Sequence, residues 1–146
     1  MAERYEAGQS DKRAWGEYIV TAARYDGDVC VECQKDITVY PSAILSLQSH
    51  DRRSEIWTLT AGTLIVVLDG QAVPLKAGES IAIPLGAIPT ADNPTHENAV
   101  FHEIQSGACH EDDIHRYWDV AGRAVENDSR PVVQSSIKIC QEITGL

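Results

Sequence analysis

The segment Thr63–Leu75 reads TLIVVLDGQAVPL and contains the strongest indication of fold class in the chain. Two mostly apolar runs flank Asp69 and Gly70, and both of these residues tolerate the positive φ angles of a two-residue hairpin turn. The pattern therefore predicts two antiparallel strands, Thr63–Leu68 and Gln71–Leu75, joined by a tight turn.

Similar short segments run through the first 110 residues, separated by turn residues about every 8 to 12 positions, a spacing typical of sandwiches and barrels. We expect further strands at Tyr18–Tyr25, Val29–Cys33, Ile37–Val39, Ile44–Gln48, Ile56–Thr60, Ser80–Ile83 and Val100–Gln105, and a stiff loop at 84–89. No segment before residue 110 has the periodicity of an amphipathic helix. The predicted fold class is all-β.

The chain changes character after Gly122, and residues 124–146 are expected to form a C-terminal extension to a single domain over 1–123. Val133, Ile137 and Cys140 have the i, i+4, i+7 spacing of one helix face. Asp128 or Ser129 ahead of Pro131 suits a helix start, whereas the β-branched content also allows a strand. We expect the extension to pack on the barrel or on a partner subunit.

Charge and hydropathy exclude some partners. The 146 residues include 12 Lys and Arg against 22 Asp and Glu, a net charge of −10. This balance opposes non-specific binding to nucleic acid and docking on anionic membranes, although a few arginines can still form a positive pocket. No apolar run approaches the roughly 18 to 20 residues of a membrane span, and residues 1–13 lack the apolar core of a secretory signal. We expect a cytoplasmic protein.

Cys30 and Cys33 form a CxxC motif, but no second motif follows at zinc-site spacing. The surrounding residues read as a strand, in which positions three apart point to opposite faces. We therefore interpret these two residues, together with Cys109 and Cys140, as unpaired structural thiols.

Polar residues that could carry chemistry cluster in LSLQSHDRRSEIW, residues 45–57. Gln48 and His50 lie two apart on a strand and share a face, and Glu55 follows after a bend. Gln, His and Glu side chains that converge inside a barrel are reasonable ligands for a divalent metal, and the alternative is a solvated strand end. His96, His110 and His115 have no such spacing and are interpreted as loop residues.

Further sequence blocks occur together with this segment in a fixed order. They are RAWGEY (13–18), LSLQSHDRRSEIW (45–57), AGT (61–63), IPLGAIPTADNP (83–94), EIQSG (103–107) and EDDIHRYWDVAGR (111–123). Together they resemble the C-terminal cupin domain of type II mannose-6-phosphate isomerases, which occurs alone or fused to mannose-1-phosphate guanylyltransferase. The resemblance covers roughly 12–123. It implies a cupin double-stranded β-helix, a jelly-roll barrel with the ligand site at one mouth.

The resemblance also implies a metal site, in which Gln48, His50 and Glu55 match the family pattern. The second histidine position is Arg52, and the loop histidine position is Pro89. Proline cannot coordinate a metal and a guanidinium repels one, so two of the four expected ligands are replaced. The expected cofactor is a divalent Zn, Mn, Fe, Co or Ni ion in a reduced site, with His102 as a candidate replacement ligand.

The activity implied by the resemblance is the interconversion of mannose 6-phosphate and fructose 6-phosphate, a sugar-phosphate aldose–ketose isomerisation in polysaccharide biosynthesis. This reaction moves a proton between C2 and C1, and it needs a base and a group that stabilises the developing oxyanion. The candidate catalytic residues are His50, Glu103 and Arg123, and the candidate substrate-binding residues are Arg52, Arg53 and Gln105. No segment resembles a nucleotide-binding domain, so we expect no guanylyltransferase activity.

Two alternatives follow from the same substitutions. A metal-free cupin enzyme would act on an activated sugar, with His50 as base and the Arg52 guanidinium near the expected metal position. Arg52 could instead simply pair with Glu55 or Asp51 at the rim. A non-catalytic cupin would bind a sugar, a sugar nucleotide or another small ligand, or serve only as a dimeric scaffold. For each case the family resemblance favours a homodimer with a small-molecule sugar ligand.

Overall fold

The computed structural model describes residues 4–110 and 112–146, and the described part confirms the all-β prediction. The strands are β1 (Ser10–Arg13), β2 (Gly16–Asp26), β3 (Val29–Val39), β4 (Ala43–Ile44), β5 (Leu47–Ser49), β6 (Arg53–Ala61), β7 (Thr63–Leu68), β8 (Gln71–Lys76), β9 (Ser80–Ile83), β10 (Pro89–Asn93), β11 (Ala99–Gly107) and β12 (His115–Trp118). One helix, α1 (Pro131–Thr144), follows them in the described chain. Glu111, the first residue of the block at 111–123, and residues 1–3 lie outside the described residues.

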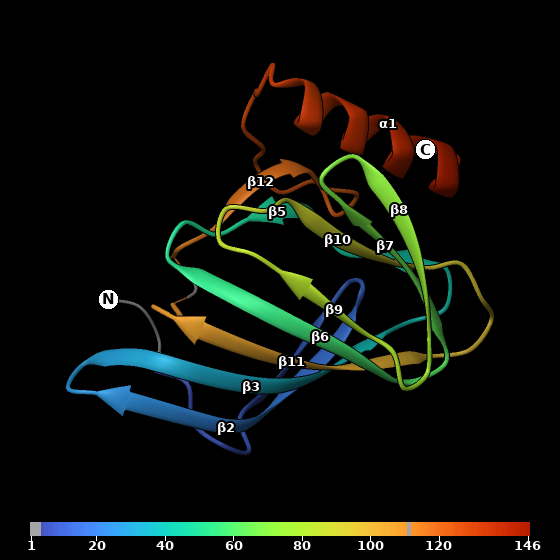
Figure 1. Ribbon diagram of the computed structural model, residues 1–146. Coiled ribbons are helices and arrows are strands. Elements are labelled where there is room, and N and C mark those ends of the chain that lie inside the picture. Colours follow the sequence, from blue (N-terminus) through green and yellow to red (C-terminus); the bar gives the residue numbers. More distant parts are fainter. Residues whose placement is uncertain (1–3, 111) are drawn as a thin grey trace.

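Two sheets face each other and form an open barrel of the double-stranded β-helix type. The larger sheet has the strand order β1-β2-β3-β11-β6-β9, and the smaller one has the order β4-β10-β7-β8. The short pair β5 and β12 lies beside the smaller sheet at one end of the barrel (Figure 1). Non-consecutive strands such as β3, β11 and β6 are therefore neighbours, which brings residues far apart in the sequence to one wall.

The predicted hairpin is confirmed. Leu68 pairs with Gln71 across the turn, and Asp69 and Gly70 have φ angles of 48° and 79°. The Asp69 carboxylate also accepts a hydrogen bond from the backbone N–H of Ile88 at 2.9 Å. This turn therefore fixes the register of β7 against β8 and also holds the backbone just before β10.

Some predicted boundaries are wrong. The two segments predicted around Cys33 and Ile37 form one continuous strand, β3, and sequence periodicity did not reveal β1, β10 or β12. Cys30 and Cys33 do not point to opposite faces, since both are buried with no exposed surface. The β2–β3 register shifts opposite Arg24 and Tyr25, where a β-bulge changes the side-chain alternation. All four cysteines are buried and free, as predicted.

The main core fills the space between the sheets, around Trp57, Leu59, Val66 and Phe101. Inward and outward residues alternate along β6 and β11, the period expected of half-buried strands. The alternation continues into Glu55, Glu103 and Gln105, which are polar residues at inward positions. Buried polar groups require partners, and these positions mark the end of the barrel where the site lies.

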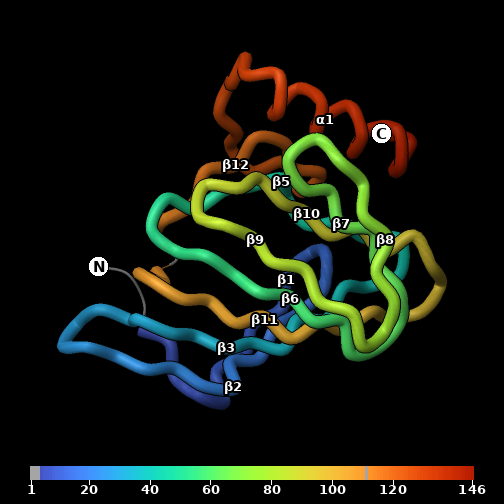
Figure 2. The backbone as a smooth tube through the Cα atoms, in the orientation of Figure 1, coloured from blue at the N-terminus to red at the C-terminus, as the bar shows by residue number. Residues whose placement is uncertain are grey.

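The C-terminal extension forms a helix, and the strand alternative is wrong. Helix α1 covers the smaller sheet on the side away from β3 (Figures 1 and 2). Val133 and Cys140 are fully buried in a second apolar cluster with Leu47, Val67 and Ile88. The N-cap is Arg130 and makes no side-chain cap hydrogen bond, so neither Asp128 nor Ser129 begins the helix.

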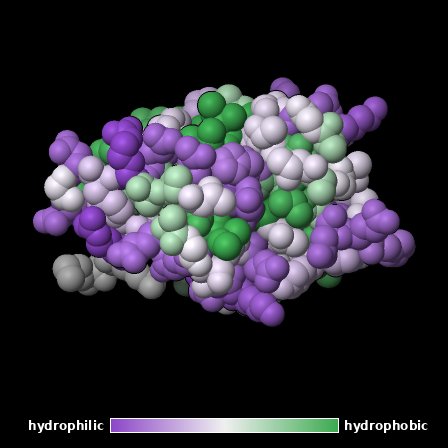
Figure 3. Space-filling view, turned by 90° about the horizontal axis from the view of Figure 1, so that it is seen from below, coloured by the Kyte–Doolittle hydropathy of each residue, from purple (hydrophilic) through white to green (hydrophobic). Residues whose placement is uncertain are grey.

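The opposite side of the molecule, near β2, β3 and β11, is mainly hydrophilic with separate hydrophobic patches (Figure 3). Ile19 on β2 and Ile56 on β6 are 43% and 48% exposed. No helix in the described part of the chain is long and apolar enough to cross a membrane.

Candidate functional site

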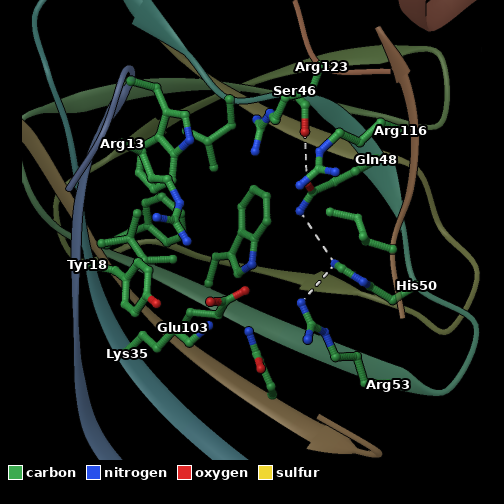
Figure 4. A pocket seen from close by; sticks show the side chains of 17 residues that line it. Arg13, Tyr18, Lys35, Ser46, Gln48, His50, Arg53, Glu103, Arg116 and Arg123 are labelled. Atoms are coloured by element: carbon green, nitrogen blue, oxygen red, sulfur yellow. Dashed lines mark hydrogen bonds between the residues drawn. The ribbon is translucent and has the colours of Figure 1, made fainter. Parts of the chain in front are cut away.

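A cavity of about 390 Å³ opens at the end of the barrel, between the larger sheet and the β5–β12 pair (Figure 4). Five cationic side chains line it, although the chain as a whole carries a net charge of −10. They are Arg13 at the end of β1, Lys35 on β3, Arg53 on β6, Arg116 on β12 and Arg123 beyond β12. Glu103 is the one carboxylate among the described lining residues. The cavity is therefore suited to an anionic small molecule.

A chain of hydrogen bonds runs down one wall of the cavity (Figure 4). The Ser46 hydroxyl donates to Oε1 of Gln48 at 2.8 Å, and Nε2 of Gln48 lies 3.4 Å from Nε2 of His50. The same His50 nitrogen lies 2.9 Å from Nη2 of Arg53. Each member of the chain therefore fixes the rotamer of the next.

His50 is buried and electrically neutral in this setting. Its Nδ1–H donates to the backbone carbonyl of Asp113, which leaves Nε2 as the acceptor for Arg53. Burial, assisted by the Arg53 guanidinium, lowers the pKa of His50 to about 4. The Nε2 lone pair of this neutral imidazole therefore already faces N–H donors of Arg53 and Gln48.

Two buried carboxyl groups, Glu55 and Glu103, lie on the adjacent strands β6 and β11 and interact electrostatically. Burial and the Glu103 charge raise the pKa of Glu55 well above its usual range. Lys35, Glu55 and Arg53 together lower the pKa of Glu103 despite its burial. The pair therefore holds one proton, with Glu103 as the ionised member that faces the cavity.

Lys35 supplies a second buried positive charge close to this pair. It is 5% exposed, and its ammonium lies 4.2 Å from the ring centroid of Tyr5 and 4.8 Å from that of Tyr18. Cation–π contacts of this kind compensate part of the desolvation of a buried ammonium. The cavity floor thus combines one ionised carboxylate with two cations, Lys35 and Arg53.

Most of the site residues predicted from the sequence converge here. Gln48, His50, Arg53, Glu103 and Gln105 line the cavity, and Glu55 is directly behind them. Arg123 lines the rim and pairs with Asp119 at 2.7 Å.

Other predicted residues lie elsewhere. The Arg52 side chain is 59% exposed and lies 4.0 Å from Asp112 and Asp113, outside the cavity lining. His102 is also outside, on the opposite face of β11 from Glu103, where it contacts Asp36 at 2.7 Å. Pro89 is a buried residue of β10 that does not line the cavity.

The family comparison agrees with this geometry. Residues 2–119 match the family model described as "Mannose-6-phosphate isomerase C-terminal". The chain belongs to this family. It is 40% identical over 114 residues to mannose-1-phosphate guanylyltransferase of Escherichia coli (strain K12), covering 76% of this chain and 22% of that protein. It is 37% identical over 117 residues to the alginate biosynthesis protein AlgA of Pseudomonas aeruginosa, covering 78% and 23%.

The chain thus spans about a fifth of the length of these two relatives. Solved structures support the fold. A Klebsiella pneumoniae protein with a double-stranded β-helix domain superposes with a TM-score of 0.58 at 16% identity, covering 79% of this chain and 84% of that one.

Three cationic residues of the cavity were not predicted from the sequence: Arg13, Lys35 and Arg116. Lys35 carried a detectable signal, because it alternates with Cys33 and Ile37 and so occupies an inward position on β3. Arg13 and Arg116 are brought to the rim by the β1–β2 and β5–β12 pairings, which local sequence does not specify.

A second group of side chains lies outside this cavity. Ligand atoms of Asp51, Asp113 and His115 lie within 4.8 Å of one another, a grouping able to hold a metal ion. His115 belongs to β12, so its interpretation as a loop residue is wrong. Its two ring nitrogens lie 2.6 Å from Asp51 and 2.6 Å from Glu126, and the Asp113 carboxylate accepts from the backbone N–H groups of Asp51 and Arg52. Polar contacts within the protein already occupy these groups.

Proposed function

We propose that this member of the mannose-6-phosphate isomerase C-terminal family binds a sugar phosphate in the barrel cavity and interconverts its aldose and ketose forms. One observation carries the proposal: an ionised carboxylate, Glu103, faces a cavity lined by five cations. The volume of about 390 Å³ lies toward the small end of the roughly 300–1,000 Å³ typical of ligand pockets, which suits a monosaccharide.

In the proposed mechanism the cations at the rim hold the phosphate. Arg13, Arg116 and Arg123 surround the opening, and guanidinium groups bind phosphate oxygens with paired N–H donors. The sugar carbons then extend toward Glu103 and Gln105. The buried Gln105 has a side-chain oxygen without a hydrogen-bond partner among the described residues, and a sugar hydroxyl would supply one.

Glu103 is the proposed base. Its carboxylate takes the proton from the carbon next to the carbonyl, the C–H electron pair forms the carbon–carbon double bond, and the carbonyl π pair moves onto oxygen. Lys35 and Arg53 stabilise the resulting enediolate. The proton of the neighbouring hydroxyl then moves to the former carbonyl oxygen, the electron pair left on the second oxygen forms the new carbonyl, and the carbon–carbon π pair takes the abstracted proton back at the former carbonyl carbon. Positioned bases contribute about 10²–10⁴-fold to such steps.

Hydrogen exchange tests this function directly. We expect mannose 6-phosphate or fructose 6-phosphate to lose its C2 or C1 proton signal in D₂O when incubated with the protein. Glu103→Gln should slow exchange at least 100-fold while the thermal shift caused by the ligand persists. Glu142→Gln, which removes an exposed carboxylate on α1, is the matched control.

Binding without exchange would reduce the proposal to a non-catalytic sugar-phosphate receptor, and neither binding nor exchange with any hexose phosphate would refute it. The homodimer stays a prediction from the family resemblance, and the cytoplasmic location stays a prediction from the sequence. Light scattering after size-exclusion chromatography measures the oligomeric state.

A further inference from the structure

The residues that match the family metal site make hydrogen bonds that compete with a metal. A metal at this position would need the lone pair of His50 Nε2, since Nδ1 is engaged with the carbonyl of Asp113. That lone pair instead faces two N–H donors, Nη2 of Arg53 at 2.9 Å and Nε2 of Gln48 at 3.4 Å. The single histidine ligand is therefore already committed to protein partners.

The carboxylate ligand is committed in the same way. Oε2 of Glu55 accepts from Nε of Arg53 at 3.1 Å, and Oε1 accepts from the indole Nε1–H of Trp57 at 3.1 Å. The Arg53 guanidinium thus lies between His50 and Glu55, the two groups that a metal would have to join.

Arg53 is also difficult to displace. It is 7% exposed, its charge cannot be removed by deprotonation, and its expulsion would take away a cation that stabilises the ionised Glu103. The other two family ligand positions hold Arg52, which is on the surface, and Pro89, which has no donor atom. The donor set at the family metal position does not fit a divalent metal.

We propose that the guanidinium of Arg53 takes the place of the divalent metal, so that the cavity binds the oxyanion of its ligand through Arg53 and works without a metal. This rests on the proposed function only for the identity of the ligand. Hydrogen bonds to described residues use three of the five N–H groups of Arg53, and the side chain lines the cavity. Two N–H donors remain for a ligand oxygen.

The first test is a metal titration that does not depend on activity. Wild-type protein, stripped with chelator and dialysed against Zn²⁺ or Co²⁺, should retain less than about a tenth of an equivalent and show no Co²⁺ absorption band that is lost in His50→Ala. About one equivalent of metal, lost in His50→Ala, would overturn the inference.

The second test uses mannose 6-phosphate as the probe, with and without EDTA. The thermal shift should be the same in both conditions, and Arg53→Lys should weaken binding at least tenfold because the ammonium cannot bridge His50, Glu55 and the ligand together. Arg53→Met removes the positive charge altogether, and binding by this variant gives a second measurement provided that the variant folds. A thermal shift with mannose 6-phosphate that appears only when metal is added would contradict the inference.

Neighbouring arginines serve as comparisons. Arg24→Met, on the exposed edge of β2, is the inert control, and Arg52→Met separates the two adjacent positions. Loss of binding in Arg52→Met but not in the Arg53 variants would overturn the inference. Failure of wild-type protein to bind any sugar phosphate would refute the proposed function instead, while the metal titration would still decide the role of Arg53.

Discussion

Glu55 and Glu103 lie on adjacent strands and shift each other's pKa, and each is at most 5% exposed. Ionising both of two neighbouring buried carboxyl groups carries a large cost, and the raised pKa of Glu55 keeps a proton on that residue near neutral pH. The neighbouring cations determine which member is charged. Lys35 and Arg53 both favour ionised Glu103, which gives the two glutamates different roles.

This asymmetry predicts unequal effects of two similar substitutions. Glu55→Gln keeps the charge of the pair and loses about one neutral hydrogen bond, so its free energy of unfolding should fall by about 1 kcal/mol. Glu103→Gln removes the counter-charge of buried Lys35 and should cost about 3 kcal/mol. Urea denaturation at pH 7.5 measures both. Equal losses would show that the proton is not localised on Glu55.

Gly107 predicts a link between backbone geometry and the site. Its φ angle is +115°, and a Cβ at this position would collide with the carbonyl oxygen of Arg52 on the paired strand. Gly107→Ala should therefore destabilise the fold by about 2 kcal/mol and displace the start of β6, which carries Arg53. The affinity for mannose 6-phosphate should fall as well, because the start of β6 carries Arg53.

Gly78→Ala is the matched control for Gly107→Ala. Its φ angle is +93°, but no atom lies within 4 Å of the added Cβ, so only the backbone strain remains. We expect a loss of about 1 kcal/mol and no change in ligand affinity. An affinity loss of similar size in both variants would argue against a specific contact at Gly107.

The difference between Arg52 and Arg53 shows what the sequence could and could not predict. Counting forward from His50 with a strand period places Arg52 inside the barrel, but bends at Asp51 and Arg52 interrupt that period. Counting back from Trp57 and Glu55, which belong to one continuous strand, places Arg53 inside. The identity of the inward residue therefore depended on where β6 begins, and local sequence does not fix that point.

The rest of the fold likewise contains features that the sequence could predict and features that it could not. The β7–β8 hairpin was predictable because its turn residues and its apolar runs are local. Lys35 could be predicted from its alternation with Cys33 and Ile37, but Arg13 and Arg116 could not, because they come from strands whose pairing is set by the whole barrel. Glu103 and Gln105 were found through family resemblance, and the alternation along β11 explains why they face the cavity.

The contact between α1 and the smaller sheet predicts that residues 124–146 share the stability of the barrel. Val133 is fully buried against the cluster that includes Leu47 and Val67. Val133→Ala should lower the free energy of unfolding by about 2 kcal/mol in a single cooperative transition. Val125→Ala, at a 48% exposed position of the same extension, should change it by less than about 0.5 kcal/mol. A separate early transition in Val133→Ala would indicate an extension that unfolds on its own.

Asp92 predicts a pH dependence of stability that arises away from the cavity. It lies on β10, is 4% exposed, and its Oδ2 has no hydrogen-bond partner in the described structure. Burial raises the pKa of Asp92 from 3.8 to about 6. The folded state therefore binds this proton more tightly than the unfolded state does, and the group destabilises the fold above pH 6 but not below about pH 4.

Asp92→Asn removes this cost of ionisation. At pH 8 the variant should be more stable than the wild type by an amount on the order of 3 kcal/mol, at about 1.4 kcal/mol per pKa unit, and the difference should shrink as the pH falls through 6 and vanish near 4. Urea denaturation across this range measures it. Asp28→Asn makes the same charge change in an exposed turn and should show no such trend. A gain in stability that is the same at pH 4 and pH 8 would mean that the substitution acts through packing, because only a group that ionises in this interval can produce the predicted slope.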